Sequence, residues 1–412
     1  MSQFDQKLSK YAELVVRMGI NVQEGQDVVV NAPVTSPDFT RKVVRECYEA
    51  GAKNVHIEWH DDESARIRYD LAPMEAFKEF PEWKAKGLET LAERGAAFLT
   101  IKSTDPDLFK GVPAERVATN NKTAGQATNT FRQYIQSDKV AWCVSAAPSV
   151  GWAKKVFPDA SEEEAVEKLW EAMFDAVRVN TQDPVEAWKK HDKTLQTKAK
   201  FLNEQKYTAL HYTAEGTDLT IELPEGHIWK GGGGANVDGT HFIANMPTEE
   251  VFTVPKKDGV NGTVRNTKPL NYSGNVIDGF SLTFENGKVT DFKAEEGEET
   301  LKHLLDTDEG ARFLGEVALV PHSSPISQSG ILFYNTLYDE NASNHIALGS
   351  AYTFCVKGGP EMSKEELEQR GINSSITHVD FMIGSGEMDI DGIKEDGSRE
   401  PVFRNGEWAT ND

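Results

Sequence analysis

The chain has 412 residues, of which 66 are acidic and 44 are lysine or arginine, and its formal charge is -22. A surface this acidic repels phosphate backbones and anionic lipid headgroups, which argues against nucleic acid or a membrane as a partner. With 38% hydrophobic and 27% charged residues, the chain can bury a sizeable core and lacks the composition of a disordered protein.

The cysteines and the first residues indicate the compartment. Cys47, Cys143 and Cys355 lie far apart without a CxxC pair, which excludes a disulfide framework and a zinc knuckle. Residues 1–20 have helical spacing but no apolar region or cleavage site of a signal peptide. No apolar run approaches the roughly 20 residues that a membrane span needs. We expect a soluble, cytoplasmic protein.

The first half of the chain predicts alternating helices and strands. The predicted strands are four short apolar runs: 28–30, 54–59, 96–101 and 140–144. Helical segments separate them, which is typical of a parallel sheet with crossover connections. Residues 161–205 predict helices, the first of them capped by Ser161 and followed by three acids.

After Lys206 the pattern changes to antiparallel hairpins. Residues 207–222 alternate around a turn at Glu215-Gly216, and 262–295 contain Asn-Gly and Ser-Gly turns. We therefore expect an α/β protein with two domains. Residues 1–205 form an α/β domain with a mostly parallel sheet, and residues 206–412 an α+β domain with a mixed or antiparallel sheet that carries the functional site.

The segment ITHVDFMIG places two chemically active side chains on one side of a predicted strand. Because alternate residues of a strand share a face, His378 and Asp380 project together, away from the apolar Val379 and Phe381. An imidazole beside a carboxylate suits a divalent metal. The alternative is a surface His–Asp pair on a half-exposed strand.

The segment NASNHIALGSAY offers a second imidazole. His345 and Tyr352 are seven residues apart, nearly two helical turns, so a helix would place them on one face. Gly349 would leave room for a ligand beside the backbone. The alternative is a core or surface histidine without a ligand.

Acidic residues interrupt two further strand-like runs. In NMPTEEVFTVP, extended backbone places Glu250 with Phe252 on one side and Glu249 with Val251 on the other. In RFLGEVALVP, Glu316 stands among apolar residues. Such acids are costly to bury unless something neutralises them, the alternative being that they face solvent.

Two further patterns are weaker. The motif HIEWH at 56–60 is not the HExxH of metalloproteases, and a polar strand edge explains it better than a second metal site. The glycine run 231–234 lacks the surroundings of a phosphate-binding loop and predicts a flexible loop near the active site.

Taken together and in order, these four segments resemble the bacterial metallo-aminopeptidase family that includes aminopeptidases T and S. The stretch GTDLTIELPEGHIWKGGGG and the N-terminal layout support the resemblance, which covers nearly the whole chain. The resemblance implies a cytosolic, dimeric exopeptidase with two divalent metal ions in one site. Its motifs carry the metal ligands over to Glu250, Glu316, His345, His378 and Asp380, and place Tyr352 close to the metals.

The charges of these residues are consistent with two metals. Three carboxylates and a bridging hydroxide would balance two divalent cations, and two imidazoles complete a mixed ligand set. This set suits zinc or cobalt, with magnesium and manganese as alternatives. We expect hydrolysis of the N-terminal residue of short peptides with a free amino terminus, by a water that both metals activate.

Three residues are expected to act on the substrate. Glu316 is the first candidate for the general base and Glu249 the second, while Tyr352 donates to the oxyanion or completes the metal shell. Two alternatives stay open. One is a binuclear hydrolase acting on another amide or ester, and the other is a metal- or peptide-binding homologue without catalysis.

Overall fold

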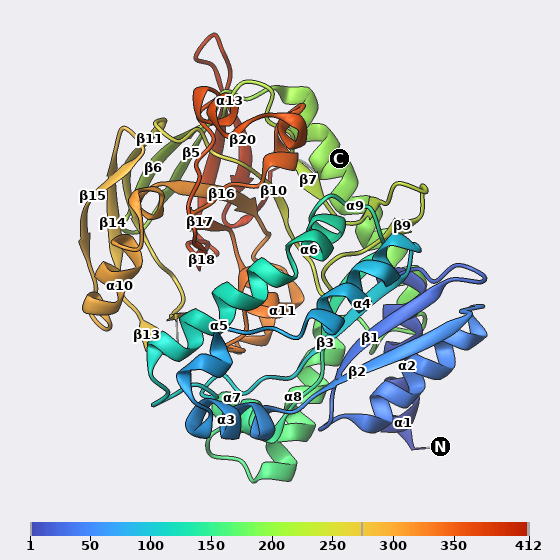
Figure 1. The fold of residues 1–412 in the computed structure, drawn as a ribbon. Helices are drawn as coiled ribbons and strands as arrows, with labels where there is room; N and C mark the ends of the chain where they lie inside the picture. Colours follow the sequence, from blue (N-terminus) through green and yellow to red (C-terminus); the bar gives the residue numbers. More distant parts are fainter. Residues whose placement is uncertain (1, 273–274, 410–412) are drawn as a thin grey trace. The chain divides into compact units, whose positions relative to one another are not determined.

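The computed structural model describes residues 2–272 and 275–409 (Figure 1). The chain divides into two compact units, which we call the N-terminal unit (Met1–Lys190 with Gly233–Pro247) and the C-terminal unit (His191–Gly232 with Thr248–Asp412). The domain boundary near residue 205, which the sequence predicts, stays a prediction.

A parallel four-stranded sheet in the order β2-β1-β3-β4 forms the centre of the N-terminal unit. Its strands are β1 (Asp27–Pro33), β2 (Asn54–His60), β3 (Ala97–Lys102) and β4 (Trp142–Ala146). The sequence predicts all four strands and their parallel pairing, and both predictions are confirmed.

Helices alternate with these strands along the chain. They are α1 (Gln3–Leu14), α2 (Pro37–Glu49), α3 (Asp62–Leu71), α4 (Glu82–Glu93), α5 (Ala114–Ala127), α6 (Asn129–Gln136), α7 (Val150–Val156) and α8 (Glu162–Ala176). Ser161 caps α8 as predicted, since its side chain accepts a hydrogen bond from the backbone N–H of Glu164. The long helix α9 (Pro184–Gln205) follows.

An antiparallel eight-stranded sheet is the larger sheet of the C-terminal unit, in the order β15-β14-β11-β6-β5-β19-β20-β21. Its strands are β5 (Ala209–Ala214), β6 (Thr217–Glu222), β11 (Val260–Arg265), β14 (Ser281–Glu285), β15 (Lys288–Lys293), β19 (Asp389–Ile393), β20 (Arg399–Arg404) and β21 (Glu407–Trp408). The predicted hairpin at 207–222 is confirmed as β5 and β6.

A second antiparallel sheet carries the candidate site, in the order β18-β17-β16-β10-β7. Its strands are β7 (Lys230–Gly231), β10 (Val251–Thr253), β16 (Leu314–Leu319), β17 (His345–Gly349) and β18 (His378–Met382). Shorter elements complete the fold: β8 (Gly234–Ala235), β9 (His241–Phe242), β12 (Leu270–Tyr272), β13 (Asn275–Ile277), α10 (Glu298–Leu305), α11 (Pro325–Ser329), α12 (Thr336–Asp339) and α13 (Lys364–Gln369).

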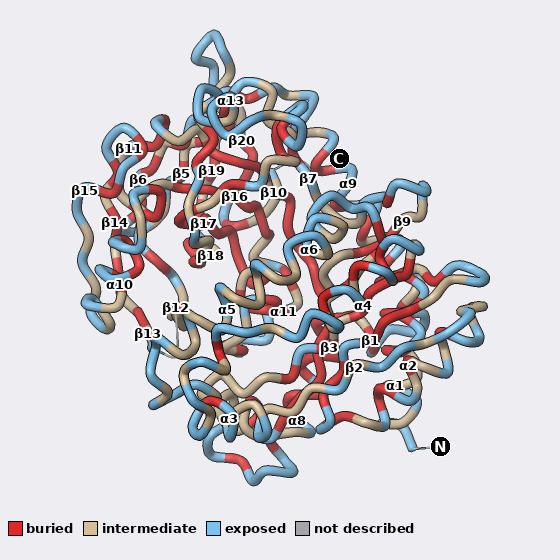
Figure 2. Tube along the Cα trace, in the orientation of Figure 1, coloured by how far each residue is buried: buried red, intermediate tan, exposed pale blue. Residues whose placement is uncertain are grey.

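Strands β16 and β17 are buried along their whole length (Figure 2). One face of their sheet contributes Val317, Leu319, Ile346, Leu348 and Phe381 to the core of the C-terminal unit. Two fully buried strands are a rigid support, so side chains on the other face of the sheet are held in place by the core beneath them. Among the described residues, no helix is long and apolar enough to cross a membrane.

Candidate metal centre

The predicted ligands project from one face of this five-stranded sheet. In the strand register, Glu316 of β16 is opposite Ala347 of β17, which is opposite Asp380 of β18. Residues opposite one another share a face, and so do residues two apart on a strand. His345 and His378 are each two positions from a member of this row, so they lie on the same face.

Glu250 lies on the same face of the sheet, next to β10, which pairs with β16 on the side away from β17. It precedes β10, in which Phe252 is opposite Ala318 and Val251 is opposite Leu319. Glu250 is two residues before Phe252 and shares its side, whereas Val251 packs in the core. The predicted alternation of this segment is thus confirmed.

Small residues keep the space between these side chains open. Ala347 is fully buried between Glu316 and Asp380 of the neighbouring strands, and Ala318 is fully buried opposite His345. Gly349 is opposite His378. A larger residue at either alanine would fill the volume into which the carboxylates and imidazoles converge.

A β-bulge at Gly315 turns Glu316 toward the site. Leu314 is opposite Leu348 and packs in the core, and the register then shifts before Glu316 pairs with Ala347. Without the shift, Glu316 would share the core face of Leu314, since the two are two residues apart. Glycine is required there, because a Cβ on Gly315 would lie 2.3 Å from the carbonyl oxygen of Ser350. The bulge explains how an acid occupies an apolar strand.

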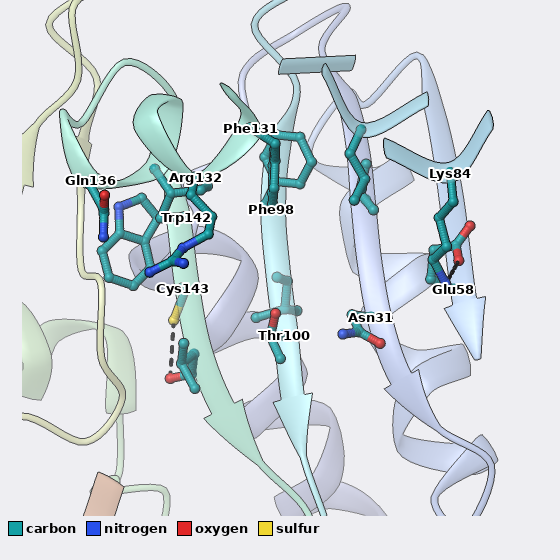
Figure 3. Close-up of a pocket in the computed structure, with 15 residues that line it drawn as sticks. Asn31, Glu58, Lys84, Phe98, Thr100, Phe131, Arg132, Gln136, Trp142 and Cys143 are labelled. Carbon is teal, nitrogen blue, oxygen red and sulfur yellow. Dashed lines mark hydrogen bonds and ion pairs between the residues drawn. The ribbon is translucent and has the colours of Figure 1, made fainter. Parts of the chain in front are cut away.

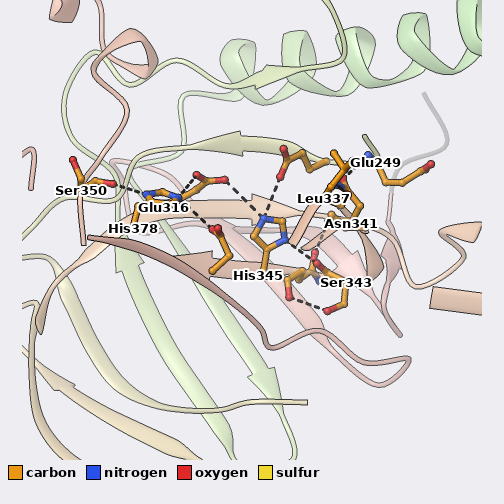
Figure 4. A network of polar contacts seen from close by, with 12 residues as sticks. Glu249, Glu316, Leu337, Asn341, Ser343, His345, Ser350 and His378 are labelled. Carbon is orange, nitrogen blue, oxygen red and sulfur yellow. Dashed lines mark hydrogen bonds and ion pairs between the residues drawn. The ribbon is translucent and has the colours of Figure 1, made fainter. Parts of the chain in front are cut away.

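The side chains form two groups that share Glu316 (Figure 4). In the first, Nε2 of His345 lies 3.1 Å from Oε2 of Glu250 and 3.8 Å from Oε1 of Glu316. In the second, Nε2 of His378 lies 3.3 Å from both Oε2 of Glu316 and Oδ1 of Asp380. Within each group, one ligand atom per residue lies within 4.8 Å of the others. Each group therefore offers three ligands for one cation.

Backbone carbonyl groups orient both imidazoles. Nδ1 of His345 lies 3.0 Å from the carbonyl oxygen of Ser343, and Nδ1 of His378 lies 2.7 Å from that of Ser350 (Figure 4). A carbonyl oxygen only accepts, so Nδ1 carries the proton and donates it. This leaves Nε2 of each ring directed at the carboxylates, the usual arrangement of a metal-binding histidine.

The electrostatics of this cluster show an excess of buried negative charge. Burial is the main cause that raises the pKa of Glu316, to about 7, with Asp380 and Glu250 adding to it. Burial alone would lower the pKa of His345, but the carboxylates of Glu250, Asp380 and Glu316 raise it to about 10. In the same way Asp380 and Glu316 raise the pKa of His378 to about 11. Protons on the two imidazoles thus balance part of the negative charge of the cluster, which bound cations would otherwise balance.

Glu340 is a further acid of this cluster, and the sequence reasoning missed it. Burial, followed by the charges of Glu250 and Asp380, raises its pKa well above the usual range. With Asp380 it lines a small cavity. Among the described residues, no lysine or arginine forms an ion pair with Glu340, Glu250, Glu316 or Asp380. No pattern in the sequence identifies Glu340, which stands five residues before His345 and next to another acid, Asp339.

Tyr352 lies beside the cluster, although the helix predicted for this segment is wrong. His345–Gly349 is strand β17, and Tyr352 follows it at the start of a short 3-10 turn. Its ring centroid is 4.8 Å from that of His378 and 5.2 Å from that of Phe354. Burial and the charges of the nearby acids raise the pKa of Tyr352, so the phenol keeps its proton at neutral pH.

Glu249 lies outside both groups of candidate ligands. Its carboxylate Oε2 is 3.4 Å from Nε2 of His191, and its backbone N–H donates to Oδ1 of Asn341 over 2.7 Å (Figure 4). The side chain is almost fully buried. The structure therefore separates the two predicted general bases, placing Glu316 in the cluster and Glu249 against a histidine.

The HIEWH segment forms no such cluster. It is the edge strand β2, where Nδ1 of His60 lies 3.1 Å from Oδ1 of Asn31 and Glu58 pairs with Lys84. Within the described part of the chain, the two groups that share Glu316 are the ones that could hold a metal ion.

Buried carboxylates and imidazoles converging on one rigid sheet are characteristic of a metal-dependent enzyme. A model of the family described as thermophilic metalloprotease (M29) matches residues 4–408, so the chain belongs to this family.

The chain is similar over its whole length to known aminopeptidases. Aminopeptidase AmpS of Bacillus subtilis (strain 168) is 61% identical, over 99% of this chain and 100% of that protein. Aminopeptidase 2 of Geobacillus stearothermophilus is 54% identical, over 99% of each. The solved structure of wild-type AmpT from Thermus thermophilus matches with a TM-score of 0.93 and 42% identity, covering 99% of this chain and 100% of that one. This chain is a metallo-aminopeptidase.

Proposed function

We propose that the chain removes N-terminal residues from short peptides at a centre of two divalent metal ions. The observation that carries this proposal is the pair of ligand groups that share Glu316. Glu250, Glu316 and His345 would hold one ion, and Glu316, His378 and Asp380 the other. Glu340 would complete the set, which assigns the catalytic site to the predicted C-terminal domain, residues 206–412.

The residues present suit two such ions. Four acids (Glu250, Glu316, Glu340 and Asp380) contribute four negative charges, which two divalent cations balance. Oε2 of Glu250 is buried 3.1 Å from Nε2 of His345, an ion pair that a bound cation would replace. The mixture of imidazole and carboxylate favours zinc or cobalt over magnesium.

When bound, the two ions lower the pKa of a water molecule, polarise the scissile carbonyl group and hold the free amino group of the substrate. Glu316 belongs to both ligand groups, so its carboxylate reaches the space between them. We assign to Glu316 the transfer of a proton from the attacking water to the leaving amine, a role that requires one of its two oxygens to be released from the ion it would hold. Glu249 is buried against His191, and we assign to it a positioning role.

Tyr352 is suited to stabilise the developing oxyanion. Its ring stacks on Phe354 and contacts His378, while 41% of the residue stays accessible to solvent and hence to substrate. Because the raised pKa keeps the phenol protonated, it donates a hydrogen bond to the oxyanion at neutral pH.

The cellular setting belongs to the same proposal. An acidic protein with a cluster of buried acids attracts the protonated amino terminus of a peptide. The family resemblance supports a homodimer. The absence of a disulfide framework supports action in the cytoplasm, since all three cysteines are free and buried.

A panel of substrates and metals tests this function. Chelated enzyme is supplied with zinc, cobalt, manganese or magnesium and assayed with leucyl, phenylalanyl and lysyl p-nitroanilides, with N-acetylleucyl p-nitroanilide as control. We expect turnover that depends on zinc or cobalt and is blocked by acetylation. Turnover of the acetylated substrate would favour a hydrolase for other amides, and bound metal without turnover would favour a binding protein.

A single substitution tests the ligand assignment. His378→Ala should lose metal and lower kcat/KM by more than about a hundredfold, since removing even an outer partner of a metal ligand has an effect of up to that size. The matched control is His211→Ala, which removes another histidine paired to an aspartate, 2.8 Å from Asp218. A fully active His378→Ala protein with its full metal content would refute the assignment.

A further inference from the structure

The N-terminal unit contains a cavity of about 380 Å³ that the peptidase reaction does not use. It lies over one face of the parallel sheet, with α4 and α6 as its walls (Figure 3). Cavities of this size are typical of sites for small molecules. All residues that line it belong to the N-terminal unit, whereas the candidate metal ligands belong to the C-terminal unit.

The floor of the cavity consists of two rows of side chains across the sheet. In one row, Val29, Phe98 and Trp142 are opposite one another on β1, β3 and β4. Two residues further along β1, β3 and β4, a second row contains Asn31, Thr100 and Val144, and Glu58 of β2 is opposite Asn31. Strands of parallel sheets are usually apolar on both faces, so three neighbouring polar side chains (Glu58, Asn31 and Thr100) in mid-strand are a departure that a ligand would explain.

The walls add apolar surface near the first row. Phe131 and Ile135 of α6 and Leu88 of α4 line the cavity and pack against the cluster that contains Val29 and Phe98. The ring centroids of Phe98 and Phe131 are 4.9 Å apart. This part of the cavity would bind an apolar group of a ligand.

The charged groups of the cavity leave one positive charge unbalanced. Lys84 and Glu58 pair at 3.0 Å and neutralise each other. Arg132 of α6 is exposed and lines the cavity, drawn near Trp142 in Figure 3, and it pairs with no acid among the described residues. In a chain with 66 acids against 44 basic residues, an arginine left without an acid above a cavity indicates an anionic ligand.

We propose that this cavity binds a small organic carboxylate with an apolar body. The guanidinium of Arg132 pairs with the carboxylate, a match of planar groups that allows two parallel hydrogen bonds. The apolar body contacts Phe98, Phe131 and Ile135. Such a ligand is either a free apolar amino acid or a carboxylate without an amino group.

Calorimetric titration of the metal-loaded protein tests this site with three probes of similar apolar body. They are L-phenylalanine, 3-phenylpropionate and the neutral 3-phenylpropanol. We expect saturable binding of both carboxylates, at least about tenfold tighter than that of the alcohol, since the alcohol lacks the charged partner. Tighter binding of phenylalanine than of 3-phenylpropionate would identify an amino acid as the ligand. Equal binding of the two would identify a carboxylate without an amino group.

Two variants and one control locate the binding. Arg132→Gln should weaken the binding of both carboxylates about tenfold or more and leave the affinity for the alcohol unchanged. Leu88→Trp, which fills the cavity, should abolish the binding of all three probes. Arg45→Gln, a change at another exposed arginine of the same unit, should have no effect. Absence of saturable carboxylate binding, equal affinities in wild type and Arg132→Gln, or loss of binding on chelation of the metals would overturn the proposal.

Discussion

Glu340 shows how much a single side chain contributes to the proposed metal centre. The five ligands that the family resemblance implies include three carboxylates. With a neutral water in place of a bridging hydroxide, these leave two divalent cations with one positive charge in excess. Glu340 supplies the fourth carboxylate, in a position where it interacts with Glu250 and Asp380. A centre with balanced charges is less costly to bury than one with an excess.

Replacement of Glu340 is therefore expected to weaken metal binding. Glu340→Gln keeps the shape of the side chain and removes its charge, so we expect metal affinity to fall by about ten- to a hundredfold. Metal content after dialysis against a zinc buffer measures the effect. Glu361→Gln, at an exposed acid, is the control. Equal metal content in both variants would show that Glu340 has no part in the centre.

The two imidazoles predict how metal binding depends on pH. In the metal-free protein the pKa values of His345 and His378 are about 10 and 11, because neighbouring acids outweigh the lowering effect of burial. A histidine binds metal as neutral imidazole at Nε2, so each ring releases a proton when the ion enters.

Metal affinity is consequently expected to rise with pH below about 10, the lower of the two pKa values. Calorimetry at neutral pH in buffers of different ionisation enthalpy should give more than two protons released when both sites fill, two from the imidazoles and the rest from Glu340 and Glu316, whose pKa values are also raised. A metal affinity that does not change between about pH 6.5 and pH 8.5 would contradict the assignment of either histidine.

At the scale of elements, the bulge in β16 decides which face carries Glu316. Gly315 allows it, since any Cβ there would collide with the carbonyl oxygens of Gly349 and Ser350. We expect Gly315→Ala to lower the free energy of unfolding by about 1–3 kcal/mol, as overpacking does. Because Glu316 would shift with the strand, metal content and kcat/KM should fall together.

A glycine in open space provides the control for this prediction. Gly87 lies inside α4, and a Cβ there would meet nothing within 4 Å. Gly87→Ala should therefore be neutral or slightly stabilising, because alanine favours a helix. Thermal unfolding and metal analysis of both variants measure the difference. Full metal content in Gly315→Ala would mean that the bulge does not position Glu316.

The sequence predicts elements well where the signal is local. Strands β1 to β4 are short apolar runs between helices, and the alternation around His378 and Asp380 is visible in the sequence itself. The sequence does not identify the segment of His345 as a strand. Strand β17 is buried on both faces, so its residues show no alternation of polar and apolar side chains. Its spacing to Tyr352 is compatible with a helix as well as with a strand followed by a turn.

The remaining features of the site depend on pairing between distant segments. The bulge at Gly315 is defined by the register of β16 with β17, and the role of Glu340 by its approach to Glu250 and Asp380. Neither is encoded in a short pattern. For Glu249 and Glu250 the sequence gives the alternation but not which of the two faces the cluster.

At the scale of the whole molecule, the charge of -22 is mainly a property of the surface. Four of the 66 acids belong to the proposed centre, and the rest create a negative field around the protein. A field of this kind raises the association rate of cationic substrates and is screened by salt.

Peptides of different charge are expected to respond differently to ionic strength. Between about 0.01 M and 0.15 M salt, kcat/KM should fall several-fold for Leu-Lys-Lys, rise for Leu-Asp-Asp and change little for Leu-Gly-Gly. The rate of leucine release at low substrate concentration gives kcat/KM for each peptide. The same salt response for all three peptides would exclude any role of the field in substrate capture.

The central claim is that two metal ions share Glu316 on one face of the five-stranded sheet. Anomalous scattering from crystals of the cobalt-loaded protein, measured at the cobalt absorption edge, tests it most directly. We expect two peaks about 3.5–4 Å apart, one beside Glu250 and His345 and the other beside His378 and Asp380, with Glu316 beside both. A single peak, or two peaks that do not share Glu316, would contradict it.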